Sequence, residues 1–168
     1  MKRSSFLIAV FGSLFLFGCA GYKLGGSQPK GIKTVYVEPI VNKSGETAIE
    51  IQAMAALRQR IQFDGRTTLV NKREDADGII SVTLTGFSIS AIAFRKDQKT
   101  TAEQYRLRVK AISKLTDRKT QKVLSESDTY GETVFSFQSD LTTSKRNAVP
   151  QAMQELSKFI LDDLLERW

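Results

Sequence analysis

The sequence predicts an α+β two-layer sandwich, in which two helices pack on one face of a mostly antiparallel or mixed sheet of about four strands. Two segments carry apolar residues at helical spacing along a single stripe, and several others alternate apolar and polar residues as half-buried strands do. Their order along the chain is strand, helix, several strands, helix. One-faced helices and a one-faced sheet bury their apolar sides together by forming a helix layer on a sheet layer.

The first strand and the first helix follow from short local patterns. Residues 33–38 are mostly β-branched or aromatic and are closed by Pro39, which is typical of a strand. After a loop over residues 42–45, residues 47–50 have the spacing of a capping box, and apolar residues then recur every four positions. We therefore expect a helix that ends at Gly65.

Two strands of the middle region are recognised by length and composition. Residues 67–70 form a short strand, and after a charged turn a β-rich run covers residues 79–94. The apolar positions of this run change parity at Gly86, which indicates a β-bulge at the glycine. Asp75 and Asp77 in the turn have the spacing of metal-loop carboxylates, but the further oxygen ligands of such a loop are missing, so a turn is the better interpretation.

The clearest alternation lies between Tyr105 and Leu115, where apolar residues alternate with mostly basic ones. A polar turn over 116–121 then leads to a strand over 122–137 that carries acidic residues. The basic row consists of Arg106, Arg108, Lys110 and Lys114, and the acidic residues are Glu126, Asp128 and Glu132. We interpret the row as a solvated face partly neutralised by the next strand, with phosphate binding as the alternative.

The C-terminal segment predicts an amphipathic helix that ends near Trp168. Its apolar stripe consists of Val149, Met153, Leu156, Ile160 and Leu164. Pro150 is expected in the first turn, with Asn147 as the N-cap. A start near Ser144, with a kink at the proline, is the alternative.

The N-terminal residues have the three parts of an export signal. Lys2 and Arg3 precede an apolar stretch over Phe6–Phe17 that is too short to span a membrane, and Gly18 is the small residue before cleavage. Cys19 follows directly and is the only cysteine in the chain. The lipoprotein pathway attaches diacylglycerol through a thiol at this position, so we expect a lipoprotein.

Processing at Cys19 would divide the chain into a signal peptide over 1–18, a lipidated flexible tether over 19–31 and a single α+β domain over 32–168. The cysteine would carry S-diacylglycerol and an N-linked acyl chain such as palmitate, and buried acyl chains make a stable anchor. Ala20 stands where aspartate often causes retention in the inner membrane. We therefore expect the periplasmic face of the outer membrane, and no cofactor besides the covalent lipid.

Residue types that are absent limit the chemistry of the chain. It contains no histidine, and its one cysteine is assigned to lipid. His-based acid/base catalysis, thiol chemistry and His or Cys metal sites are thereby excluded, and we expect a protein that is not an enzyme. Removing the signal leaves 23 basic and 18 acidic residues, a net charge of +5, which suits anionic lipid, lipopolysaccharide or an acidic protein face. Nucleic-acid binding is not expected, because an exported domain without the usual modules has no access to it.

The loop between the two longest strands holds the main candidate binding residues. Phe94, Arg95, Lys96 and Lys99 place an aromatic ring beside three cations at the end of a sheet, where ligands are often bound. A hairpin tip kept polar for solubility is the alternative. Lys145, ahead of the apolar stripe of the last helix, is a weaker candidate of the same kind.

With these features in order, the chain resembles the lipopolysaccharide-assembly lipoprotein family, LptE, over nearly the whole segment after Cys19. The matching residues are Gly21-Tyr22, Leu24, Pro29 to Pro39, Asn42, Ala56-Leu57-Arg58, Ala76-Asp77, Phe94-Arg95, Thr101-Ala102-Glu103, Tyr105, Thr116-Asp117-Arg118, Val123-Leu124 and Leu165-Glu166-Arg167-Trp168. Each piece is common, and their order and spacing carry the resemblance.

The resemblance implies a non-catalytic subunit of the lipopolysaccharide transport complex, which plugs and helps assemble the outer-membrane β-barrel that inserts lipopolysaccharide. It matches Arg95 to a basic loop residue linked to lipopolysaccharide binding and aligns Lys145 with another. Phosphates of lipid A favour such donors, and Phe94 would lie against acyl chains. The alternative function is an outer-membrane lipoprotein that regulates a peptidoglycan synthase or scaffolds a secretion complex.

Overall fold

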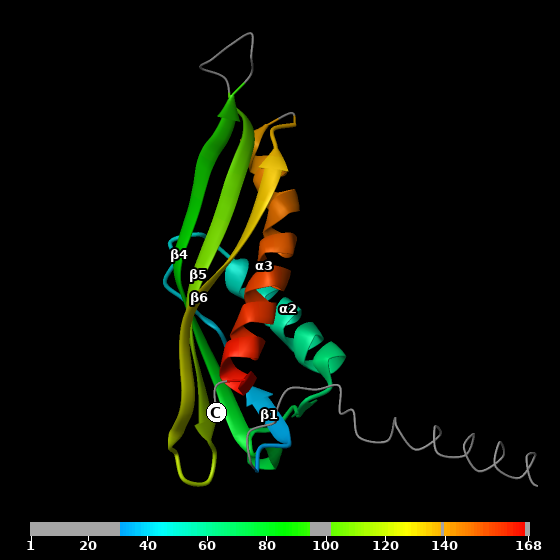
Figure 1. The fold of residues 1–168 in the computed structure, drawn as a ribbon, viewed down its shortest axis with the longest axis vertical. Helices are drawn as coiled ribbons and strands as arrows, with labels where there is room; N and C mark the ends of the chain where they lie inside the picture. The colour runs from blue at the N-terminus through cyan, green and yellow to red at the C-terminus, as the bar shows by residue number, and fades with distance from the viewer. Residues whose placement is uncertain (1–30, 95–101, 139, 167–168) are drawn as a thin grey trace, which may run out of the picture.

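The computed structural model describes residues 31–94, 102–138 and 140–166. They form two helices and a six-stranded mixed sheet of order β3-β1-β4-β5-β6, with β2 beside β4. Both helices lie on one face of the sheet (Figure 1). The predicted α+β class with two helices is confirmed, but the sheet has six strands instead of about four.

The short strands account for the difference in strand number. β1 (Thr34–Val37) and β2 (Val41–Asn42) follow each other along one edge of β4 (Gly78–Phe94), and both run parallel to it. β3 (Thr68–Leu69) pairs in parallel with β1. The prediction that Asn42 lies in a loop was wrong, because a two-residue strand is specified by its partner and has too few residues to show a period.

Helix α2 (Ile49–Asp64) buries the predicted stripe of Ile49, Ala53, Leu57 and Ile61. It ends at Gly65, which has a φ of 72° and donates its N–H to the carbonyl of Ile61. The predicted capping box does not form, because Ala48 occupies the N-cap position with a φ of 61° and no side-chain cap. Glu50 instead accepts a hydrogen bond from Asn42 Nδ2 at 2.7 Å.

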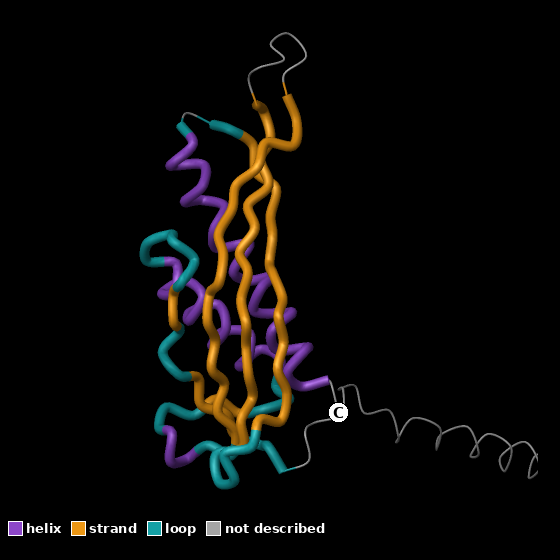
Figure 2. Tube along the Cα trace, turned by 90° about the vertical axis from the view of Figure 1, so that its left-hand side faces the viewer, coloured by secondary structure: helices purple, strands orange, loops and turns teal. Residues whose placement is uncertain are grey.

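The three long strands are β4, β5 (Ala102–Asp117) and β6 (Val123–Ser136), paired antiparallel in this order. The predicted bulge is present as a register shift between Leu84 and Gly86. Figure 2 shows β4 and β5 extending beyond the start of the last helix. The apolar residues of β5 that face the helices are buried: Leu107, Val109, Ala111 and Leu115.

The basic row of β5 lies beside the acidic residues of β6. Arg108 Nη2 is 2.7 Å from Glu132 Oε2, and Lys114 Nζ is 3.0 Å from Glu126 Oε1. The guanidinium of Arg108 also lies 4.3 Å from the ring centroid of Tyr130. This arrangement agrees with the interpretation of a solvated face partly neutralised by cross-strand pairs.

Helix α3 (Leu141–Glu166) begins six positions earlier than the predicted cap at Asn147, and Pro150 lies inside it. Asp140 starts the helix, because its Oδ1 accepts the N–H of Thr143 at 2.7 Å. The prediction of Asn147 as cap, with Pro150 in the first turn, was therefore wrong. The carbonyl that Pro150 leaves without a donor belongs to Arg146, an exposed residue, so water can satisfy it. The predicted apolar stripe of this helix is buried.

Asp77 joins the first strand to the start of β4. Its Oδ2 accepts the backbone N–H groups of Lys33 and Thr34 and the hydroxyl of Thr34, each at 3.0 Å. These hydrogen bonds, first among them the one from Lys33, hold the pKa of Asp77 below its usual range. The carboxylate thus acts as a structural acceptor, in agreement with the turn interpretation.

Ser113 on β5 is a buried hydroxyl whose Oγ has no hydrogen-bond partner, and the residue is 0% exposed. We expect Ser113→Ala to raise the free energy of unfolding by about 1 kcal/mol, because it removes a desolvated polar group and breaks no hydrogen bond. Ser125→Ala is the control, since Ser125 Oγ donates to the carbonyl of Leu164 at 2.8 Å and its loss should cost about 1 kcal/mol. Urea unfolding measures both, and effects of the same sign would contradict the prediction.

Candidate functional site

We define the distal half of β4 as Gly86–Phe94. A groove, called the distal groove below, lies between this segment and the start of α3. Its volume is about 270 Å³, and its lining residues are Glu46, Phe87, Ser88, Ile89, Leu141, Thr142 and Lys145. Lys145 Nζ is 2.7 Å from Glu46 Oε1 and 5.9 Å from the ring centroid of Phe87. The groove therefore combines apolar side chains with one partly exposed ion pair.

Asn42 holds the loop that presents Glu46 to this groove. Its Nδ2 donates to the carbonyl of Glu46 at 2.8 Å, and its Oδ1 accepts the N–H of Ser44 at 3.1 Å. The opposite wall depends on the early start of α3, which places Lys145 in a helix and not in the loop before one. The pairing of Lys145 with Glu46 joins residues 99 positions apart, and no local pattern in the sequence signals it.

The other candidate residues are placed apart from Lys145 or lie outside the described residues. Phe94 is at the end of β4, 52% exposed and paired with Ala102. It is seven residues along the strand from Phe87, or roughly 20 Å. The end of β4 and the start of α3 lie toward the same end of the molecule (Figure 1), but Phe94 does not line this groove. Four of the predicted site residues lie outside the described part of the chain: Arg95, Lys96, Lys99 and Cys19.

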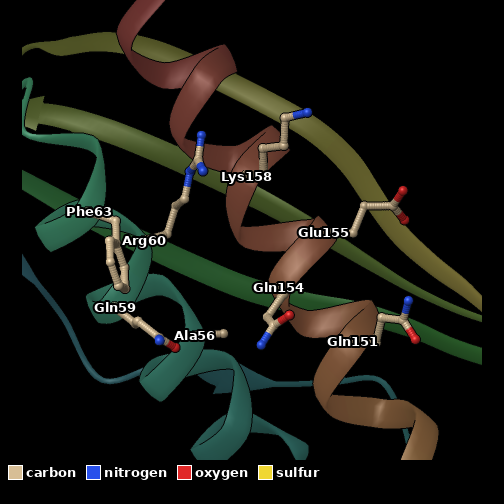
Figure 3. Close-up of a pocket in the computed structure, with 8 residues that line it drawn as sticks. All are labelled: Ala56, Gln59, Arg60, Phe63, Gln151, Gln154, Glu155 and Lys158. Carbon is tan, nitrogen blue, oxygen red and sulfur yellow. The ribbon is translucent and has the colours of Figure 1, made fainter.

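A second groove, of about 540 Å³, lies between the two helices (Figure 3). It is lined by Ala56, Gln59, Arg60 and Phe63 of α2 and by Gln151, Gln154, Glu155 and Lys158 of α3. Phe63 is 78% exposed, and the other side chains are mainly amides and opposite charges. This lining forms a mixed polar surface with one exposed ring.

Among residues 31–94, 102–138 and 140–166, no group of three His, Cys, Asp or Glu side chains is placed to hold a metal ion. No helix in the same ranges is long and apolar enough to cross a membrane.

Comparison with known proteins gives one family match. The model of the family LptE, described as lipopolysaccharide-assembly, matches residues 32–168. No curated protein matches the sequence significantly.

Several solved structures share the fold at low sequence identity. A protein from Xanthomonas campestris is 10% identical with a TM-score of 0.53, covering 83% of this chain and 88% of its own. A hypothetical protein from Chlamydia trachomatis is 10% identical with a TM-score of 0.52, covering 77% and 93%. A putative lipoprotein from Caulobacter crescentus is 13% identical with a TM-score of 0.50, covering 74% and 86%. At such identities the likeness shows the fold alone.

Proposed function

Because the chain belongs to the LptE lipopolysaccharide-assembly family, we propose that it is a non-catalytic, lipid-anchored subunit of the complex that assembles lipopolysaccharide at the outer membrane. In this role it plugs and helps assemble the β-barrel that inserts lipopolysaccharide, and it binds lipopolysaccharide itself. The observation that carries the proposal is the family match, which includes every described helix and strand.

The proposed anchor is Cys19, after removal of the signal over 1–18. The tether over 19–31 leads into a single domain over 32–168 at the periplasmic face of the outer membrane. Thirteen residues from Cys19 to Ile32 reach at most about 43 Å, at roughly 3.3 Å per residue. A domain on such a tether stays close to the membrane and to a barrel embedded in it.

The chemistry of the distal groove supports lipopolysaccharide binding. Within the described residues, Lys145 forms one ion pair, with Glu46, and both side chains are about one quarter exposed. Such a pair is worth about 0–1 kcal/mol, so a phosphate that carries more charge can compete for the ammonium.

The first experiment is to purify the tagged full-length protein from native membranes in mild detergent. A stoichiometric outer-membrane β-barrel is the expected partner. A peptidoglycan synthase or a secretion pore in its place would overturn the proposal and favour the alternative function.

We expect Arg95→Ala combined with Lys145→Ala to weaken lipopolysaccharide binding about tenfold, or about 1.4 kcal/mol, because two phosphate donors are lost. The measurement is a titration of the full-length protein with lipopolysaccharide, with thermal unfolding as the check on folding. Lys110→Ala combined with Lys114→Ala removes the same charge from the outer face of β5 and is the matched control. Equal losses in both variants would indicate nonspecific attraction, and no loss would remove Arg95 and Lys145 from the site.

A further inference from the structure

The edges of the sheet differ in how they are protected from pairing with other chains. β6 carries Glu126, Asp128 and Glu132, and the Glu155 carboxylate on α3 accepts the backbone N–H of Glu132. At the opposite edge, β3 is two residues long. Charged side chains, covering contacts and short strands are the usual means by which proteins prevent unwanted strand addition.

Among the described residues, the distal half of β4 carries no charged side chain and pairs with no strand at its open edge. Register shifts, which mark bulges and also discourage strand addition, fall at Leu84/Gly86 and after Ala91, so the stretch from Gly86 to Ala91 is regular. β1 pairs with β4 at 78–80 and β2 pairs with it at 83–84, and the last backbone contact on this side is Lys43 N to Leu84 O at 2.8 Å. Beyond Leu84, no strand in the described part of the chain pairs with this side of β4. Figure 1 shows the distal half as the outermost strand of the sheet.

The composition of this segment favours strand pairing. The run Gly-Phe-Ser-Ile-Ser-Ala-Ile-Ala-Phe over 86–94 contains no charged residue and no proline. Uncharged segments rich in β-branched and aromatic residues pair readily with other strands. A long open edge of this kind is a liability unless another strand covers it in the working protein.

The register identifies the backbone groups that face the open edge. Glu132 directs its N–H to Glu155, away from β5, so Arg108 and Glu132 form a non-hydrogen-bonded pair. Because the two kinds of pair alternate, Arg108 directs its own backbone groups to Ser88 of β4. The β4 residues that direct their N–H and C=O groups to the open edge are then Phe87, Ile89 and Ala91.

We propose that the open edge of β4, from Phe87 to Ala91, accepts an extended strand of a partner protein. The partner's backbone pairs with the exposed N–H and C=O groups, and its alternate side chains enter the 270 Å³ groove beside Leu141. The occupant is thus an extended segment with an apolar side chain at every second position. The strand belongs to the barrel subunit, and this choice of partner rests on the proposed function.

A second copy of this chain fits the groove less well. Its own β4 edge would bring the side chains of Phe87 and Ile89, which already pack against the core of their own domain. They cannot also fill the neighbouring groove. An extended segment with free side chains can satisfy the backbone groups and the groove together.

Hydrogen exchange on the full-length protein tests the proposal directly. In the protein freed of its partner, the amides of Phe87, Ile89 and Ala91 should exchange quickly, while those of Ser88 and Ser90, bonded to β5, exchange slowly. In the complex purified from native membranes, the first three should become protected. A partner strand protects only these three amides, because protection alternates along the strand. Burial of the whole segment by a contact that is not a strand would not give this alternation.

A pair of proline variants provides a second test. Ala91→Pro removes an amide that faces the open edge, at an exposed position with little packing to lose. Asp128→Pro is the matched control, because Asp128 is exposed and its amide points outward from β6 on the same side as that of Glu132. We expect Ala91→Pro to lower the co-purified partner about tenfold and Asp128→Pro to leave it unchanged.

The outcomes separate this inference from the proposed function. A barrel that co-purifies equally with both variants, without protection of the open-edge amides, overturns the strand pairing and leaves the proposed function standing. A different protein held through the open edge supports the pairing and overturns the barrel assignment. Protection that arises on dimerisation of the purified chain, or a chain that holds no protein at all, overturns the inference of a partner strand.

Discussion

Gly131→Ala is expected to lower the free energy of unfolding by about 3 kcal/mol, the upper end of typical overpacking costs. A Cβ at Gly131 would lie 2.3 Å from the carbonyl oxygen of Ala152, 2.4 Å from the N of Leu156 and 2.6 Å from its Cβ. Two of these atoms are backbone, so no side-chain rotation relieves the clash. The helix would have to move away from β6 and loosen the packing of buried residues along α3.

Gly86→Ala is the control for the general effect of replacing a glycine in a strand. The three atoms nearest to a Cβ at Gly86 belong to the side chain of Lys110 and lie 3.7 Å or more away, which is an ordinary van der Waals distance. We expect a change within about 0.5 kcal/mol. Urea unfolding followed by circular dichroism measures both variants, and a similar effect of the two would show that the approach of α3 to β6 does not require Gly131.

The features that the sequence predicts well are those with a local period. The stripe of α2, the alternation of β5 and the parity change at Gly86 all depend on residues within one element, and the structure contains each of them. A period of 3.6 or 2 determines which side chains share a face before any partner is known. The two-layer arrangement then follows because each element has only one face to bury.

The features that the sequence does not reveal depend on partners distant along the chain. Val41 and Asn42 form a strand only because β4 lies beside them, and Lys145 meets Glu46 only after α3 has packed on the sheet. Asp140, which caps α3, and Asn147 are both plausible caps by local pattern, and that pattern alone does not rank the two. Gly131 has no local signal either, since its requirement comes from the backbone of α3.

Arg66→Met is expected to lower the free energy of unfolding by about 2 kcal/mol, because it breaks a partly buried ion-pair network, for which the loss is smaller than for a fully buried pair. Arg66 is the second residue after α2, and its side chain is 9% exposed. Its guanidinium contacts Asp64 Oδ1 at 2.5 Å, Asp162 Oδ1 at 2.7 Å and Glu166 Oε1 at 3.0 Å. It therefore joins the end of α2 to the end of α3 through three carboxylates. Arg66→Lys keeps the charge but not the fork geometry, and we expect about half the loss.

Removing the carboxylate as well tests whether the cost comes from Asp64, which in Arg66→Met would be left with the more distant Arg60, 3.8 Å away. Burial would raise the pKa of Asp64, but its hydrogen bonds and charge interaction with Arg66 outweigh burial and hold this pKa below the usual value of 3.8. Asp64→Asn added to Arg66→Met should then recover part of the lost stability. The pKa of Asp64 is lower in the folded state than in the unfolded state, so this contribution is present at neutral pH and is lost as the pH falls through and below 3.8. The difference in free energy of unfolding between the wild type and Arg66→Met should therefore narrow in acid. A difference that stays constant from neutral pH to pH 3.8 and below would contradict this prediction. It would assign the effect of Arg66 to packing of its aliphatic stem and not to the ion pairs.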